Sequence, residues 1–300
     1  MTRETGFLPV DIATLAYAVV TSIAATLLAR GAGTGWQWLL CANALTVVAV
    51  LLAPRARAAG PVGQFVGDFY PMLILAGVYS AVGIVTVPNG HPHDVVIQRL
   101  EQWMFGSQLS YRWIREVPSP ALSWFLHLSY LAYYPILSVP PLVLWLTDRR
   151  DGARVTMFGT LTALYVCYVT FMLFPVVGPR YAFPLADNAA TNVWPARFTQ
   201  WLLNGGDSWG AAFPSSHVAG AVVSTLCALR FSRPLGLSFL PWTIGLVLGV
   251  VYGQFHYAVD AIAGLVVAAG VLASLSAEAW RAREMGLRPA VDWESPTGPL

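Results

Sequence analysis

The stretch YGQFHYAVDAIAG (residues 252–264) places two ionisable side chains, His256 and Asp260, inside an otherwise apolar run. On a helix, residues four positions apart share one face, so the aspartate can accept a ring N–H and fix the orientation of the imidazole. An aspartate within a membrane span is costly unless it is paired or hydrated. The pair therefore indicates a catalytic imidazole, with a structural hydrogen bond between helices as the alternative.

The composition of the chain indicates a membrane protein. Of its 300 residues, 56% are hydrophobic and 11% are charged, and the mean hydropathy is +0.59. These values predict one all-α, polytopic membrane bundle that has the bilayer as its partner. A net charge of +2 does not indicate a nucleic-acid surface, so no nucleic acid is expected as a partner. All 17 basic residues are arginines, which excludes a Schiff base or a lysine phosphate clamp.

The cysteines and the histidines outside the apolar runs give little indication of a metal site. The three cysteines lie in apolar segments at unrelated spacings, which argues against a disulfide framework or a zinc site. His91, His93 and Asp94 could ligate a metal, but a solvated loop is the simpler interpretation. We therefore expect no metal and no cofactor.

Apolar runs of about 20 residues, the length that crosses a bilayer, occur about eight times. They lie near residues 10–29, 36–53, 69–87, 121–146, 154–175, 211–230, 236–253 and 256–276. Arginines follow every second span, and 11 of the 17 fall on that side of the membrane. The positive-inside rule then predicts an integral plasma-membrane protein with both termini in the cytoplasm.

Three regions are expected along the chain. Residues 1–90 form N-terminal membrane helices, residues 91–276 form a core with the catalytic histidines, and residues 277–300 form a disordered cytoplasmic tail. The long loops 88–120 and 176–210 face outward in this topology, and the first has the pattern of an interfacial or re-entrant helix. All candidate site residues fall on the same side, which predicts an active site on the extracytoplasmic side.

The segment AAFPSSHVAGAVV (residues 211–223) places His217 at the start of another apolar run. Pro214 suits a first helical turn, and Ser215 and Ser216 add hydroxyl groups to the uncommitted backbone N–H groups of a helix start. Such an end binds anions, and phosphate is the expected one. Simple helix capping is the alternative.

Arg180 follows the fifth predicted span and could supply a forked, permanently charged donor set for phosphoryl oxygens. The alternative is an arginine that extends its guanidinium to the membrane interface. One membrane face is thus predicted to hold four polar candidates, Arg180, His217, His256 and Asp260, which favours a single site.

These residues resemble the type-2 phosphatidic acid phosphatase superfamily, whose helical bundles include lipid phosphatases and vanadium haloperoxidases. The second motif of that family reads PSGH and is matched here by PSSH, which ends in His217. The third motif ends in a histidine, three residues and an aspartate, as His256 and Asp260 do. The first motif ends in arginine-proline, whereas a tyrosine follows Arg180. The resemblance spans residues 95 to 275.

Two cations of the family pattern are absent. The lysine position of the first motif holds Leu173, and the arginine position of the third motif holds Val250. These departures resemble the divergent branch that contains the inositol phosphorylceramide synthases and related bacterial membrane proteins. The FG dipeptide in WMFGSQ, the HY dipeptide at His256 and the tyrosine-rich LSYLAYYP are similar to that branch as well.

The resemblance implies phosphoryl transfer without a metal. His256 would attack phosphorus to form a phosphohistidine, Asp260 would orient and charge-stabilise it, and His217 would protonate the leaving alkoxide. The equatorial oxygens would be held by a substrate-binding set that consists of Arg180, Ser215 and Ser216.

The expected substrate is a phospholipid, a sphingolipid-like phosphate or an isoprenoid phosphate. Water as the acceptor would make the protein a phosphatase, and an alcohol would make it a phosphotransferase. The missing cations leave a second hypothesis, a catalytically degenerate lipid-binding or transport membrane protein of the same fold. A vanadate-dependent haloperoxidase is a third, disfavoured because the bundle is membrane-embedded and lacks the usual cation clamp.

Overall fold

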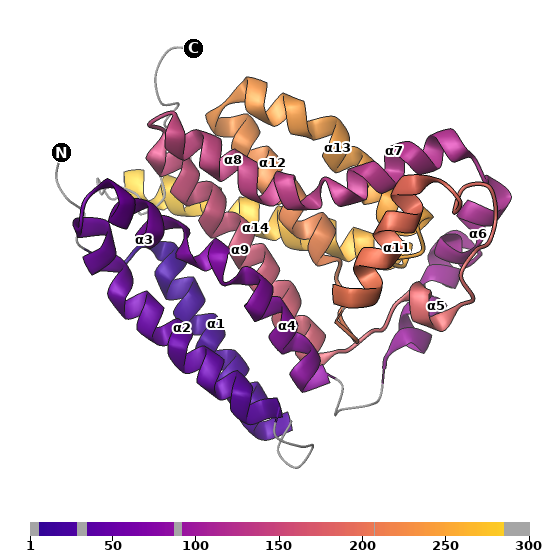
Figure 1. The fold of residues 1–300 in the computed structure, drawn as a ribbon, viewed down its shortest axis with the longest axis horizontal. Helices are drawn as coiled ribbons and strands as arrows, with labels where there is room; N and C mark the ends of the chain where they lie inside the picture. The colour runs from indigo at the N-terminus through magenta and orange to yellow at the C-terminus, as the bar shows by residue number, and fades with distance from the viewer. Residues whose placement is uncertain (1–5, 29–34, 87–91, 207, 285–300) are drawn as a thin grey trace.

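The computed structural model describes residues 6–28, 35–86, 92–206 and 208–284, and this part of the chain contains α-helices and no β-strand. The N-terminal helices are α1 (Pro9–Leu28), α2 (Gly35–Ala58), α3 (Pro61–Leu73) and α4 (Leu75–Thr86). In Figure 1, α1 and α2 form an antiparallel hairpin at one side of the molecule, and α4 lies nearer the core.

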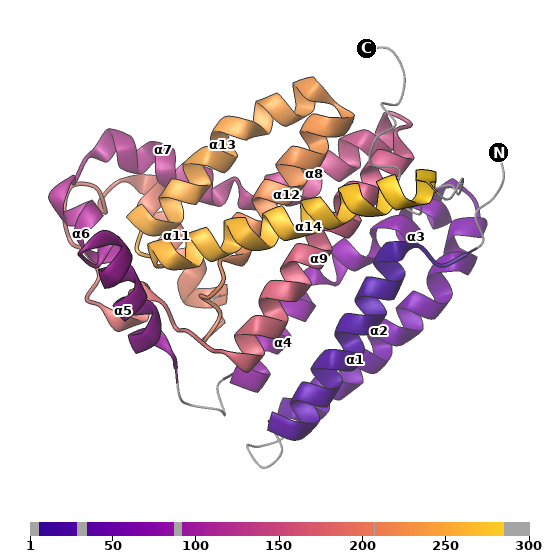
Figure 2. The ribbon, with the colours of Figure 1, turned by 180° about the vertical axis from the view of Figure 1, so that it is seen from behind.

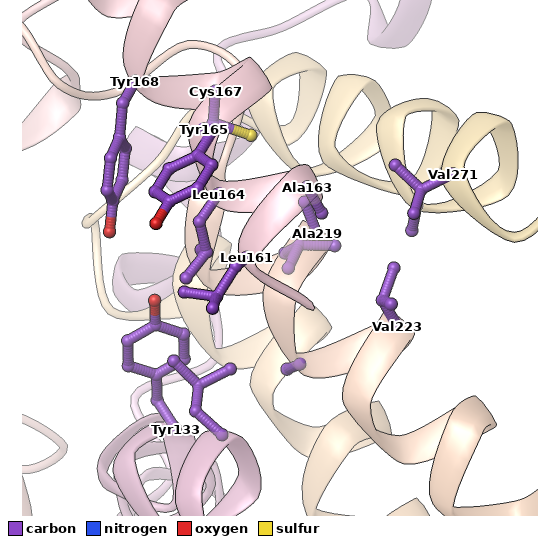
Figure 3. Close-up of a cluster of buried hydrophobic side chains, with 14 of the residues drawn as sticks. Tyr133, Leu161, Ala163, Leu164, Tyr165, Cys167, Tyr168, Ala219, Val223 and Val271 are labelled. Carbon is purple, nitrogen blue, oxygen red and sulfur yellow. The ribbon is translucent and has the colours of Figure 1, made fainter. Parts of the chain in front are cut away.

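The core is built from helices that surround a central one. They are α7 (Pro120–Leu131), α8 (Tyr133–Leu146), α9 (Arg150–Leu173), α12 (Ser216–Phe231), α13 (Arg233–Tyr252) and α14 (Ala258–Glu284). The central helix α12 packs against α8, α9, α13 and α14. Figure 3 shows Leu164 of α9 near Ala219 of α12, and Val271 of α14 facing Val223 of α12. Small residues let these helices approach, since a Cβ on Gly220 would lie 3.0 Å from the Leu164 side chain.

Four short helices lie in the two long loops that the sequence predicts to face outward. They are α5 (Asp94–Phe105), α6 (Leu109–Glu116), α10 (Pro179–Ala182) and α11 (Trp194–Gly206). Figure 2 shows α5 and α6 at the opposite side of the molecule from α1 and α2. The short helices therefore cluster at one end of the core.

The predicted all-α membrane bundle is confirmed. Among the described residues, six helices are long and apolar enough to cross a membrane, and the pair α7–α8, bent by 48°, gives a seventh if it is one span. The span predicted over residues 211–230 corresponds to α12, which has 16 residues and is shorter than the roughly 20 required for a full span. The reason is that residues 211–215 turn across the end of the bundle instead of continuing the helix.

The predicted tail begins at residue 277, before the end of α14. Helix α14 runs to Glu284, so the disorder expected over residues 277–300 is wrong for residues 277–284. The sequence there is rich in alanine, glutamate and arginine, which favour helix. Residues 285–300 lie outside the described residues.

A buried ion cluster joins the N-terminal helices to the core. The guanidinium of Arg57 donates to both carboxylate oxygens of Asp11, at 2.7 and 2.8 Å, and to Asp68 at 3.1 Å. These three side chains are at most 2% exposed. Trp145 of α8 and Arg154 of α9 also contact Asp68. Arg57, one of the arginines that follow the second predicted span, is therefore a core residue.

We expect Arg57→Met to destabilise the protein by about 3–5 kcal/mol, because it leaves the buried Asp11 carboxylate without its counter-charge. The measurement is the thermal unfolding midpoint in detergent micelles. Arg55→Met is the matched control, since Arg55 is exposed on the same helix. Equal midpoints for the two variants would show that the cluster does not hold the N-terminal helices.

Candidate active site

Three segments that are far apart in the sequence meet at one end of the core. The segment after α9 and the segment before α12 form a short parallel bridge, in which the Ala212 N–H donates to the Val176 carbonyl oxygen at 2.9 Å. The segment before α12 also contacts the start of α14, where the Ser215 N–H donates to the Asp260 carbonyl oxygen at 2.9 Å. Backbone hydrogen bonds thus bring the three predicted motifs together.

His256 lies in the connection between α13 and α14, so the prediction that it shares a helical face with Asp260 is wrong. Its ring Nδ1 lies 2.9 Å from the carbonyl oxygen of Ala212. Because a carbonyl oxygen only accepts, Nδ1 carries a proton and the neutral ring keeps its lone pair on Nε2. The Ala212 carbonyl therefore fixes the tautomer of the ring and also its orientation, the role that the sequence predicts for Asp260.

Asp260 is close to His256 but does not hydrogen-bond to it. Its Oδ2 lies 3.6 Å from Nδ1 of His256 and accepts the backbone N–H of Tyr257 at 2.8 Å. This contact from the third residue of a helix back to the residue before it is half of a capping box. The other oxygen, Oδ1, is buried and has no hydrogen-bond partner among the described residues. The carboxylate is therefore held by the start of α14, with one oxygen close to the His256 ring.

His217 lies in the first turn of α12, beside His256. The centroids of the two rings are 5.6 Å apart. The His217 ring stacks on Tyr130 at 4.8 Å and lies 4.3 Å from the ring of Tyr133. Its Nδ1 is buried and has no hydrogen-bond partner among the described residues. Aromatic packing therefore holds this ring in place.

The two serines before His217 have different positions. Ser215 is the N-cap of α12, and its Oγ accepts the Val218 N–H at 3.4 Å, so capping is realised at this residue. Ser216 is the first residue of α12 and lines a large cavity together with His217. A role for either serine in substrate binding stays a prediction.

Arg180 reaches the same cleft as the two histidines. Its guanidinium donates to the side-chain oxygens of Gln200 and Asn204 on α11. The cleft has a volume of about 20 Å³, and Arg180, His217 and His256 all line it. Among the described residues of this lining, Arg180 is the only arginine. The structure thus places a permanent positive charge beside two imidazoles.

Asp94, the first residue of α5, holds two of the three segments. Its Oδ1 accepts the Gly178 N–H and the Tyr257 O–H, each at 2.9 Å, and its Oδ2 accepts the Val177 N–H at 2.9 Å. Gly178 has a φ of +88°, and a Cβ there would lie 3.0 Å from the Cβ of Ala212. The turn that Asp94 binds therefore requires glycine.

Glu101 continues this support two helical turns later. Its Oε2 accepts the Ala258 N–H at 2.8 Å, at the start of α14, and its Oε1 accepts the Ser110 N–H at 3.1 Å. Burial raises the pKa of its carboxyl group, and the backbone N–H groups oppose that shift. From the sequence, Asp94 is a candidate only as a metal ligand, and Glu101 is not a candidate site residue. The sequence pattern that could have identified them is their spacing: Asp94 and Glu101 share a helical face with Ile97, which is 3% exposed.

The candidate metal ligands have other partners. The His93 ring stacks on Phe174 with centroids 4.1 Å apart, and Asp94 accepts the bonds described above. His91 lies outside the described residues. Among the residues that the structure describes, no three histidine, cysteine, aspartate or glutamate side chains are grouped as a metal site.

The fold and the cleft define a helical membrane protein with two histidines and an arginine at one end of its bundle. Residues 96–274 match a family model described as the PAP2 superfamily, so the chain belongs to this superfamily, the type-2 phosphatidic acid phosphatases. Its members are generally phosphatases or phosphotransferases. Searches of curated proteins and of solved structures found no significant match. The matched residues begin in α5, so α1 to α4 lie outside them.

We expect Asp94→Asn to loosen the turn before α10. The amide offers one acceptor oxygen where the carboxylate offers two, so at least one buried N–H or O–H donor loses its partner, at roughly 1–3 kcal/mol. Faster hydrogen exchange at Val177 and Gly178, measured by mass spectrometry, is the expected result. Asp187→Asn, at an exposed position of the same loop, serves as the control. Unchanged exchange at these two amides in Asp94→Asn would show that α5 does not hold the turn.

Proposed function

We propose that the protein is a membrane-embedded lipid-phosphate phosphatase or phosphotransferase that works through a phosphohistidine on His256. The observation that carries this proposal is the contact from Nδ1 of His256 to the Ala212 carbonyl, because it leaves the lone pair on Nε2. The same ring lines a cleft with His217 and Arg180. Membership of the PAP2 superfamily supports phosphoryl chemistry at this cleft.

In the first step, Nε2 of His256 attacks phosphorus and the bond from phosphorus to the lipid oxygen breaks. Protonated His217 gives its proton to that leaving oxygen. The phosphorylated imidazole gains positive charge, which the Asp260 carboxylate 3.6 Å from Nδ1 stabilises. In the second step, water or an alcohol gives a proton to His217 and attacks the phosphohistidine, which frees His256.

The negative charge of the transition state spreads over three equatorial oxygens and needs donors. Arg180 and the backbone N–H groups at the start of α12 supply them in this proposal. Val250 holds the arginine position of the third motif and supplies no positive charge. Its side chain is fully buried, and its carbonyl oxygen accepts the His256 N–H at 2.9 Å. Leu173 is 65% exposed at the end of α9. Charge stabilisation therefore depends on Arg180 more than the family pattern implies.

We further propose that the protein belongs to the branch that resembles the inositol phosphorylceramide synthases. Two dipeptides that carry this resemblance lie in α5 or contact it. Gly106 of the FG dipeptide ends α5 with a φ of +66°, and the hydroxyl of Tyr257 in the HY dipeptide donates to Asp94. The substrate would be a phospholipid, sphingolipid-like or isoprenoid phosphate. The arginine distribution supports cytoplasmic termini and an extracytoplasmic site in the plasma membrane.

Turnover of radiolabelled phosphatidic acid and isoprenoid phosphate by the purified protein tests the proposal. We expect His256→Ala and Asp260→Ala to lose activity, and His217→Ala to lose it by about 10²–10⁴-fold, the usual contribution of a general acid. His93→Ala is the matched control and should retain activity, because His93 does not line the cleft. Full turnover in His256→Ala and Asp260→Ala would rule the proposal out.

The absence of two family cations supports one alternative, a catalytically degenerate lipid-binding or transport protein. It predicts that the wild-type protein binds lipid phosphates, seen as a raised thermal midpoint, but releases no phosphate and forms no transfer product. Turnover that depends on His256 excludes this alternative.

A further inference from the structure

A second, larger cavity lies next to the histidine cleft. It has a volume of about 490 Å³ and shares three lining residues with the cleft: Tyr79, Leu203 and His217. Its walls come from α3, α4, α8, α9, α11 and the first turn of α12. We call this cavity the chamber. His217 therefore borders both cavities, and its ring lies beside that of His256.

The lining of the chamber suits an apolar occupant. Aliphatic side chains such as Met72, Leu75 and Leu137 alternate with tyrosines, and none of the described lining residues is an arginine, an aspartate or a glutamate. A charged headgroup would lose its hydration there without gaining ionic partners. The lining therefore favours a hydrocarbon chain over a headgroup.

The chamber also reaches the middle of the bundle. Met72 and Leu75 lie near the centre of the candidate span Pro61–Ile84, and Tyr133 lies at the break in the centre of the bent pair α7–α8. Tyr134, another lining residue, is 56% exposed on the side of α8, where a membrane helix faces lipid. The chamber thus extends from the end of the bundle to mid-span depth and is bordered by a lipid-exposed residue.

We propose that the chamber holds the apolar tail of the lipid phosphate, and that α3 and α4 determine which tail lengths are accepted. The inference rests on the proposed function, which places the phosphate at His256. The wall formed by Met72, Leu75 and Tyr79 lies outside the residues matched by the family model, so tail selection is a property of this chain's own N-terminal helices.

The selection works through shape. Lipid tails are already in an apolar medium in the bilayer, so entering the chamber brings little hydrophobic gain, and van der Waals packing against the walls decides the fit. A long tail that ends against Leu75 uses the full depth, whereas a short tail does not reach this wall. Narrowing the chamber at Leu75 should therefore act on long-tailed substrates only.

Leu75→Trp tests this directly, with Leu73→Trp as the matched control, because Leu73 is 68% exposed on α3 and does not line the chamber. The probes are dioleoyl and dihexanoyl phosphatidic acid in mixed micelles. We expect the ratio of kcat/KM for the dioleoyl to the dihexanoyl substrate to fall roughly tenfold in Leu75→Trp and to stay unchanged in Leu73→Trp. Equal effects on both substrates, or no effect on either, would overturn the inference.

A measurement on the wild-type protein covers the case in which the variant does not fold and separates the inference from the proposed function. Phosphatidic acid with a diazirine at the end of one tail is bound and irradiated, and the labelled peptides are mapped. Labels on residues 72–79 support the chamber even in a protein without turnover. Labels confined to other helices would overturn the inference even in an active phosphatase.

Discussion

The contact between the His256 ring and the Ala212 carbonyl is the interaction on which the site depends. It sets the position of the ring proton and connects the start of α14 to the segment that carries His217. The Ser215 to Asp260 backbone bond and the bridge at Val176 complete the link. Since all three contacts use backbone groups, the arrangement depends on the path of the chain and tolerates differences in the neighbouring side chains.

Buried carboxylates carry much of the remaining organisation. Asp94 and Glu101 bind backbone N–H groups at Val177, Gly178 and Ala258, so that α5 supports both the turn before Arg180 and the start of α14. A carboxylate without partners would be costly in this surrounding. Each carboxylate therefore fixes the position of the N–H groups that donate to it. The region that the sequence indicated only as an interfacial helix has a supporting role for the cleft.

The sequence predicted the parts of the molecule that depend on local pattern. The length of the apolar runs indicated the membrane helices, and the order of the motifs indicated which segments would meet. The partner of the His256 ring could not be predicted, because the Ala212 carbonyl is distant in sequence and every residue has such a group. For the same reason, the burial of Arg57 against Asp11 was not evident from its place after an apolar run.

The composition of the cleft explains why the two histidines carry more of the proposed chemistry than the cations do. Arg180 is held by Gln200 and Asn204, and Val250 and Leu173 stand where the family pattern has positive charge. The N-terminal helices add a wall to the chamber beside the cleft, so the matched family core and the chain's own extension both contribute to one cavity. The proposed division is chemistry in the core and tail recognition in the extension.

A search for phosphate on His256 during turnover tests the phosphohistidine mechanism directly. The wild-type protein is mixed with phosphatidic acid radiolabelled in its phosphate and quenched within one turnover, and the label is located by peptide mapping. The phosphohistidine mechanism predicts a label that is stable in base, labile in acid, attached to His256 and absent from His256→Gln. An acid-stable label, or a label that persists in His256→Gln, would contradict it.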